Sequence, residues 1–167
     1  MLPTKRDNDA AEVRLSFVRS LYLQRGTPFT GMIAHVITAS AIFAKTGDAF
    51  YLYVGVALTL IWAVRMCGMM SFDRRDNGEF TLAETIRWER YYVAGSVVVA
   101  GTLGIMCAYA LVVSHDAFAE LAAISITLAS LISVVGRNFG SRLNVDMMIL
   151  AVCVPLTAGF LILRDPF

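Results

Sequence analysis

Five long apolar runs, each almost free of charged residues, constrain this chain more than any other feature of its sequence. They cover about residues 29–44, 50–70, 91–113, 117–135 and 145–163. About 20 apolar residues in a helix cross the roughly 30 Å of hydrocarbon in a bilayer, and a helix satisfies its own backbone hydrogen bonds there. The hydrophobic share of 57% also exceeds the roughly 45–50% of soluble domains. The sequence therefore predicts an all-α membrane protein, a bundle of about five transmembrane helices.

Residues 1–28 differ from the rest of the chain, because charged residues alternate there with apolar ones. Val13, Phe17 and Leu21 recur at a spacing of four residues, and arginines flank the face that they form. The sequence at 26–28, Gly-Thr-Pro, then ends the helical pattern. We expect a cytoplasmic N-terminal segment with an amphipathic interfacial helix that lies in the headgroup layer, in front of a bundle that spans residues 29–167.

The basic residues predict the orientation of this bundle. If the N-terminus is cytoplasmic, 12 of the 14 lysines and arginines fall in cytoplasmic segments, and only Lys45 and Arg164 fall on the other side. Cytoplasmic loops carry an excess of lysine and arginine in membrane proteins. We therefore expect a multi-pass protein whose N-terminus is cytoplasmic and whose C-terminus lies outside. With five spans, a cytoplasmic domain behind this chain would need a sixth span.

His35 lies inside the first predicted span, where an ionisable side chain is a functional candidate. The alternative is a neutral imidazole that is hydrogen-bonded to Thr38 or to a neighbouring helix. His115 falls at the opposite end of the bilayer, which disfavours a haem held by two facing imidazoles. The three cysteines have no metal-ligand spacing. We predict no metal, no cofactor and, because nucleotide-binding, metalloprotease and nucleophile-elbow motifs are missing, no catalytic residues.

Arg65 is the second intramembrane polar candidate, since it lies inside the second predicted span about one turn from its end. One interpretation is that its long side chain reaches the lipid phosphates from there, as arginines near span ends do. The other is an ion pair with a carboxylate such as Glu84 or Glu89. Either arrangement would satisfy the charge within the membrane.

Small residues recur at four-residue spacing in the third and fourth spans. Gly104 and Ala108 lie in the third, and Ala119, Ala123 and Thr127 lie in the fourth. Faces of small residues let helix backbones approach closely in lipid. We expect the two spans to pack as an antiparallel hairpin on these faces, although the same pattern also serves dimerisation.

Four short motifs, in order along nearly the whole chain, carry a resemblance to a known group. They are Val18-Arg-Ser-Leu-Tyr22, Arg87-Trp-Glu-Arg-Tyr-Tyr92 with Gly95, Gly136-Arg-Asn-Phe-Gly-Ser141, and Val154-Pro-Leu156. The chain resembles the N-terminal transmembrane sensory region of alphaproteobacterial cyclic-di-GMP signalling proteins with GGDEF and EAL domains. In that group a sixth span precedes the cytoplasmic catalytic domains, and this chain ends before it. Both explanations stay open, a truncated fragment or a stand-alone descendant.

The resemblance implies a membrane-embedded sensory or anchoring module in the bacterial inner membrane, periplasmic at its C-terminus and non-catalytic by itself. The alternative is a small accessory subunit packed into a larger membrane protein complex. The predicted partners are the lipid bilayer and either a second copy or a larger complex. Nucleic acid is not predicted, because the net charge is only +1.

Two groups of residues near the predicted cytoplasmic face are further site candidates. We expect a polar cluster there that couples the bundle to whatever follows it, the alternative being a solvated loop; its members are Arg90, Arg137 and Asn138. Aromatic residues favour the membrane–water interface. The predicted interfacial belt consists of Trp88, Tyr91 and Tyr92.

Overall fold

The computed structural model describes residues 5–76, 80–138 and 141–162, with side chains from residue 12 onward except at 135, 137 and 138. This part of the chain is helical and contains no strand. Its elements are α1 (Lys5–Leu23), α2 (Gly26–Thr46), α3 (Ala49–Arg75), α4 (Leu82–Tyr109), the π-helix η1 (Ala110–Ser114), α5 (Ala117–Asn138) and α6 (Arg142–Ile162). Five of the helices are long and apolar enough to cross a membrane, so the predicted all-α membrane fold is confirmed.

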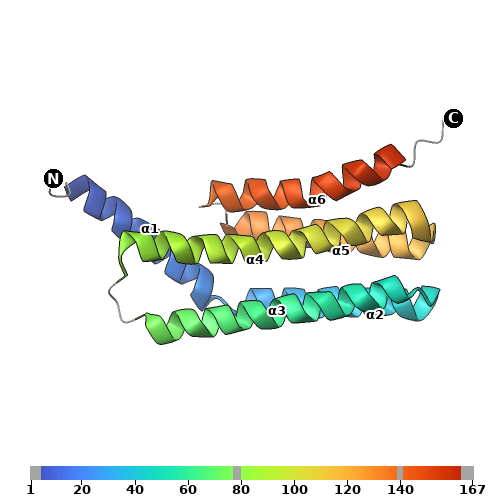
Figure 1. Ribbon diagram of the computed structural model, residues 1–167, viewed down its shortest axis with the longest axis horizontal. Helices are drawn as coiled ribbons and strands as arrows, with labels where there is room; N and C mark the ends of the chain where they lie inside the picture. The colour runs from blue at the N-terminus through green and yellow to red at the C-terminus, as the bar shows by residue number, and fades with distance from the viewer. Residues whose placement is uncertain (1–4, 77–79, 139–140, 163–167) are drawn as a thin grey trace.

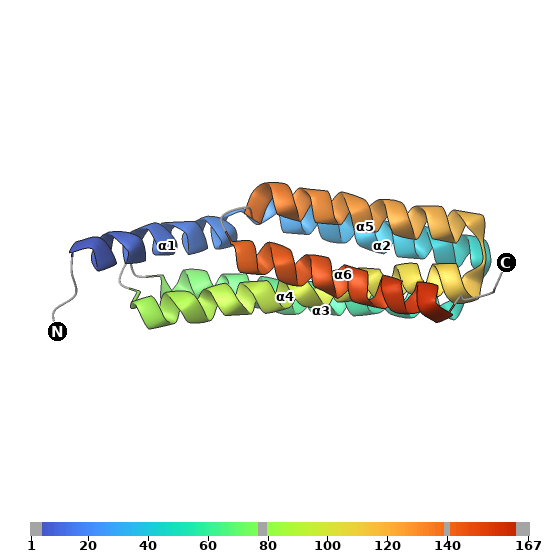
Figure 2. The same ribbon diagram turned by 90° about the horizontal axis from the view of Figure 1, so that it is seen from above.

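The five spanning helices run side by side along the long axis of the molecule, and α1 lies at one end (Figures 1 and 2). The helix α4 is central, because it contacts α1, α3, α5 and α6. We call the end where α1 lies the α1 end, and the end with the α2–α3 and α4–α5 turns the far end. The helices α3 and α4 have 27 and 28 residues, and are therefore about 40 Å long at about 1.5 Å per residue.

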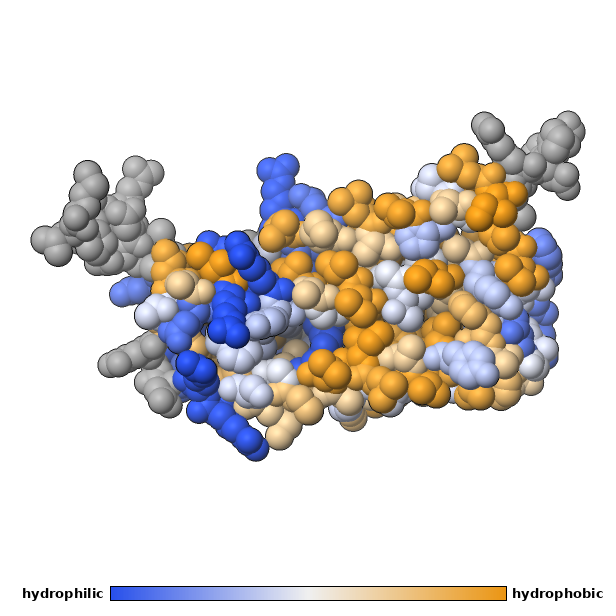
Figure 3. Space-filling view, in the orientation of Figure 1, coloured by the Kyte–Doolittle hydropathy of each residue, from blue (hydrophilic) through white to orange (hydrophobic). Residues whose placement is uncertain are grey.

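The outside of this bundle is apolar. Large hydrophobic side chains are exposed along the spanning helices, among them Leu60, Val64, Leu121, Ile132 and Leu161. Hydrophilic residues gather at the α1 end and, in a smaller group, at the far end (Figure 3). Water would oppose this much exposed hydrocarbon, whereas lipid chains do not. The chain is thus a membrane-embedded helical protein.

The helices α4 and α6 approach each other closely at two glycines. A Cβ atom added at Gly104 would lie 3.0 Å from both Cα and the carbonyl oxygen of Val152. Farther along the same pair, a Cβ added at Gly159 would lie 3.3 Å from Cβ of Ala108. The small residues of the third span therefore face α6, and the prediction that they face the fourth span was wrong. The helices α4 and α5 still form a hairpin, with Cys107 Sγ 3.0 Å from Thr127 Oγ1.

The helix α6 continues through a proline. Pro155 lies inside it, where the ring removes one backbone donor and crowds the preceding turn. Figure 1 shows α6 changing direction along its length. A bend at this position was expected from the sequence, since proline is the usual cause of such kinks.

The helix α1 packs against its neighbours. Val18, Leu21 and Tyr22 are almost completely buried against Phe72 of α3 and Tyr92 of α4. The structure thus contains a helix in the N-terminal segment, alongside the ends of α3 and α4 (Figure 2). Its predicted amphipathic placement in the headgroup layer is not shown.

At the far end, carboxylates fix the two turns. Asp48 caps α3 by accepting from Phe50 N–H at 2.9 Å, and it also accepts from Tyr109 Oη at 2.9 Å. Asp116 accepts from Ala119 N–H at 2.9 Å, and Lys45 Nζ lies 3.7 Å from its carboxylate. These contacts join the α2–α3 turn to the α4–α5 turn.

We predict a pH dependence from Asp116. The hydrogen bond from Ala119 N–H, helped by the charge of Lys45, holds the pKa of the Asp116 carboxyl below its usual value of 3.8. A lowered folded-state pKa stabilises the fold above the unfolded pKa, and this contribution is lost as the pH falls through the folded pKa. Thermal unfolding in detergent should therefore lose stability below about pH 4 more steeply in the wild type than in Asp116→Asn. Identical slopes for the two proteins would contradict the prediction.

Candidate ligand-binding cavity

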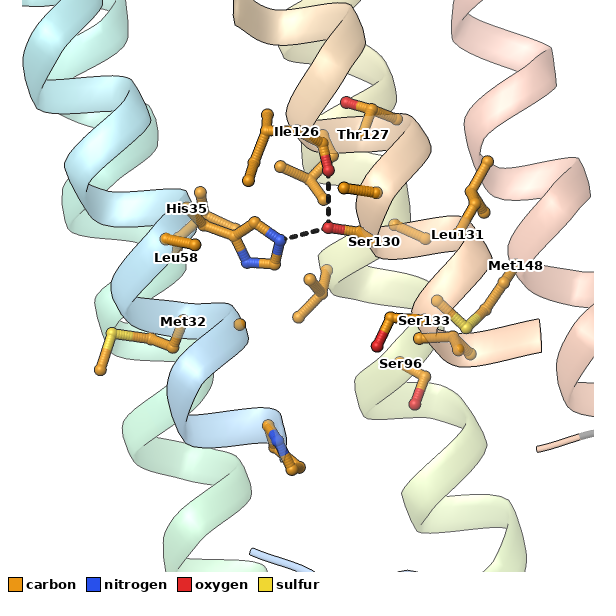
Figure 4. Close-up of a pocket in the computed structure, with 18 of the residues that line it drawn as sticks. Met32, His35, Leu58, Ser96, Ile126, Thr127, Ser130, Leu131, Ser133 and Met148 are labelled. Carbon is orange, nitrogen blue, oxygen red and sulfur yellow. Dashed lines mark hydrogen bonds between the residues drawn. The ribbon is translucent and has the colours of Figure 1, made fainter. Parts of the chain in front are cut away.

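A cavity of about 200 Å³ lies between the spanning helices, in the half of the bundle nearer to α1. It extends from Thr27 and Pro28 at the start of α2 to Leu58 and Leu103 near the middle of the bundle. Most of its wall is apolar. All five spanning helices contribute to it, including α6 through Met148 (Figure 4).

His35 reaches across this cavity to the neighbouring helix. Its Nε2 lies 2.5 Å from Ser130 Oγ on α5 (Figure 4). The Ser130 hydroxyl already donates its only proton to the carbonyl oxygen of Ile126 at 2.8 Å. Ser130 must therefore accept, and His35 Nε2 carries the proton. Thr38, the other partner considered from the sequence, donates to the carbonyl oxygen of Ala34.

Arg65 points into the bundle and lies across α4. Its Nη2 donates to Ser96 Oγ at 3.2 Å, and its guanidinium carbon lies 5.2 Å from the centre of the Tyr92 ring. The side chain fits because residue 95 is glycine, where an added Cβ would lie 3.1 Å from Arg65 Cγ. The carboxylate of Glu89 instead binds Arg14. The sequence suggested contact with lipid phosphates or an ion pair with Glu84 or Glu89. In the structure, Arg65 instead lies on the wall of the cavity.

Trp62 also lines the cavity, and its indole Nε1–H is buried without a hydrogen-bond partner in the described part of the chain. A buried donor without a partner costs about 1–3 kcal/mol. Such a cost at a cavity wall is typical of a binding site that is satisfied by a ligand or water. Arg65 lies on this wall, and neither aspartate nor glutamate is among the described residues that line it.

Tyr92 connects this cavity to α1. It lines the cavity, and its ring lies 5.7 Å from the ring of Tyr22, in an edge-to-face contact. Tyr22 also stacks on Phe72 at 4.2 Å and donates its hydroxyl proton to the carbonyl oxygen of Trp88 at 2.9 Å. Burial raises the pKa of Tyr22, so this hydroxyl stays protonated and keeps donating. The contact between Tyr22 and Tyr92 thus joins α1 to the wall of the cavity.

Three ion pairs hold α1 and the residue that precedes α2, Arg25, on the ends of α3 and α4. They are Arg14–Glu89, Arg19–Asp76 and Arg25–Asp73. Glu89 Oε2 accepts from Arg14 Nη2 at 2.7 Å, and Glu89 Oε1 accepts from Ser141 Oγ at 3.3 Å. Arg19 binds Asp76 with two nitrogens, at 3.0 and 2.8 Å, a geometry that adds directional specificity to the charge.

The remaining predicted site residues are placed as follows. Arg90 is exposed on α4. The side chains of Arg137 and Asn138 lie outside the described residues, so the predicted polar cluster stays a prediction. In the predicted belt, Tyr91 is 54% exposed, whereas the other two members face inward, as Trp88 meets Tyr22 edge-to-face at 5.8 Å and Tyr92 is buried.

The residues that sequence reasoning missed are Trp62, Ser96 and Ser130. Each lies within an apolar span, and its spacing from other residues does not mark it as part of a site. One signal was available in the sequence. Ser96 and Ser130 lie in the third and fourth spans at about the same depth as His35 and Arg65 in the first and second. Only the packing of the helices shows that these residues share one cavity.

No protein-family model matches this chain, and neither the curated proteins nor the solved structures contain a match to it.

Proposed function

We propose that this chain is a membrane-embedded sensory and anchoring module of a bacterial signalling protein of the cyclic-di-GMP type. In this proposal the cavity takes up the signal, and α1 passes it on. The observation that carries the proposal is the double role of Tyr92, which lines the cavity and packs against Tyr22 of α1. A helix that only anchors a protein needs no such contact with an internal cavity.

The stability of the contacts around α1 supports a switching role. The arginine side chains of its two ion pairs, Arg14 and Arg19, are 45% and 31% accessible, and exposed pairs contribute little, about 0–1 kcal/mol each. The aromatic contacts of Tyr22 must then provide much of the attachment. A helix that is held by few contacts is among the first parts of a protein to detach by local unfolding.

The proposed orientation follows from charge. Arg14 and Arg19 of α1, and Arg25 just after it, lie at the α1 end, and we place this end in the cytoplasm, because lysine and arginine favour that side. Signalling domains act in the cytoplasm, so α1 would lie on the side where its movement has an effect. A reporter fused ahead of residue 5 that is active only in the periplasm would contradict this orientation.

Filling the cavity with a side chain tests the function without any ligand. Ala34 is half-buried and lines the cavity, whereas Ala41 is exposed on the same helix. In Ala34→Phe we expect hydrogen exchange of the α1 amides to change by about fivefold or more, equivalent to about 1 kcal/mol. The matched control Ala41→Phe should leave the exchange of α1 unchanged, with both proteins held in lipid nanodiscs.

The same experiment separates the module from an accessory subunit. A subunit that only contributes helices to a complex has no reason to couple its cavity to α1. Unchanged exchange in Ala34→Phe, in a protein that keeps its helical circular dichroism, would therefore overturn the sensory proposal. A coding segment for cyclase domains in frame behind Phe167 would support it, and a stoichiometric partner of unrelated sequence would support the accessory role.

A further inference from the structure

We propose that the cavity binds a small neutral, apolar molecule, which enters from the lipid between α2 and α5. This inference names the ligand class of the sensory site and therefore rests on the proposed function. Its support comes from the polar groups of the wall, from the place where the cavity opens and from its volume.

The polar groups inside the cavity are already hydrogen-bonded within the protein. Ser96 and Ser130 each donate to a carbonyl oxygen of their own helix, at 3.1 and 2.8 Å, and Thr127 does the same. The two serine oxygens also accept, from Arg65 Nη2 at 3.2 Å and from His35 Nε2 at 2.5 Å. A ligand with a charge or several polar groups would lose its bonds to water and gain few from these partners. The wall therefore favours a neutral ligand.

Trp62 adds a single donor to this wall. Its indole Nε1–H is buried and has no partner among the described residues. One donor matches one acceptor on a ligand, such as a carbonyl oxygen. The ligand class is thus a hydrocarbon skeleton with at most one oxygen of this kind.

The cavity opens on the side of the bundle between α2 and α5. Thr27 of α2 and Ala129 and Ser133 of α5 line the cavity and are exposed at the surface. The two residues of α5 lie within its apolar stretch, Ala117–Val134. This part of the opening therefore faces the hydrocarbon of the bilayer, where apolar molecules concentrate and charged ones do not.

The volume limits the size of the ligand. A dry cavity of about 150 Å³ holds benzene, and this one measures about 200 Å³. It therefore accepts a molecule of about eight non-hydrogen atoms, such as a substituted benzene. A complete phospholipid is several times larger and does not fit inside.

Tryptophan fluorescence tests this proposal, because the chain has only two tryptophans. Trp62 lines the cavity, whereas Trp88 lies in the aromatic contacts of α1. In Trp88→Phe, the single remaining indole reports on the cavity. We would titrate this protein in lipid nanodiscs with 4-bromotoluene, whose bromine quenches a neighbouring indole, and with 4-bromobenzoate, in which a carboxylate replaces the methyl group.

We expect 4-bromotoluene to quench with a saturable component, in addition to the linear quenching that its fraction dissolved in the lipid causes. The anionic 4-bromobenzoate should give no saturable component. Trp62→Phe, which retains only Trp88, should show the linear part alone with 4-bromotoluene. A purely linear titration of the Trp88→Phe protein with 4-bromotoluene, or a saturable one with 4-bromobenzoate, would overturn the proposed ligand class.

A matched pair of substitutions, made in the Trp88→Phe protein, tests the opening. Ser133 lines the cavity where it opens, whereas Ser125 is exposed on the same helix and does not line it. The ring introduced by Ser133→Phe should occupy the opening and raise the apparent Kd of 4-bromotoluene by at least about tenfold. Ser125→Phe should leave this Kd unchanged. An equal Kd in the two variants, both with helical circular dichroism, would show that the ligand binds elsewhere.

The two proposals fail separately. If Ala34→Phe changes the exchange of α1 but 4-bromotoluene quenches only linearly, the module stands and the apolar ligand is wrong. If 4-bromotoluene binds as expected but Ala34→Phe leaves α1 unchanged, the cavity binds such a ligand and the sensory role is wrong.

Discussion

Replacing Gly104 with valine is expected to separate α4 from α6 and to cost more than about 3 kcal/mol in the free energy of unfolding. An added Cβ would lie 3.0 Å from the backbone of Val152 and 3.1 Å from the carbonyl oxygen of Ala151. Backbone atoms of a packed helix cannot move aside alone, so α6 must shift as a whole. Circular dichroism during thermal unfolding in detergent measures the loss.

Two alanine substitutions show how much of this loss comes from the close contact at Gly104. Gly104→Ala adds only the Cβ and should cost about 1–3 kcal/mol. Gly101→Ala is the matched control on the same helix, since its nearest neighbour, the carbonyl oxygen of Ala151, would lie 3.9 Å from the new Cβ. If Gly104→Ala proved as stable as Gly101→Ala, the close packing of α4 on α6 described here would be incorrect.

Replacing Tyr22 with alanine is expected to release α1 from the bundle. The side chain is only 3% exposed and contacts Phe72, Trp88 and Tyr92. Truncating a buried aromatic ring to alanine costs about 3–5 kcal/mol, and here the loss falls on the docking of one helix. The amide hydrogens of α1 should then exchange more than about a hundredfold faster, while those of the spanning helices keep their rates.

The hydroxyl and the ring can be separated. Tyr22→Phe removes only the hydrogen bond to the carbonyl oxygen of Trp88 and should cost about 1 kcal/mol. Tyr53→Ala removes a tyrosine that is 70% exposed and should leave α1 protected. Unchanged exchange of α1 in Tyr22→Ala would mean that the ion pairs alone suffice to hold this helix.

The spanning helices could be predicted from the sequence, because the length and hydropathy of each apolar run are properties of that run alone. The partner of Gly104 could not, since a small residue permits a close approach without specifying which helix makes it. Sequence reasoning placed it against the fourth span, and the structure places it against α6. The capping box at Thr81 and Glu84, which is also local, is present at the start of α4.

The cavity was beyond sequence reasoning for a related reason. Arg65 was recognised as a functional candidate, but its direction depends on the free space at Gly95, which lies on another helix. The importance of Trp62 and Ser130 depends on what the neighbouring helices leave unfilled. A binding volume is the space left over by packing, and no pattern within one segment specifies it.

The lengths of α3 and α4 bear on how membrane thickness would affect this protein. Helices about 40 Å long exceed a hydrocarbon layer of about 30 Å, so each has about two turns in excess. In a thicker bilayer, acyl chains would rise along this excess toward Glu89 and Asp76, which bind α1. Lipid composition alone would then change the solvent around these ion pairs, and the attachment of α1 should respond to it.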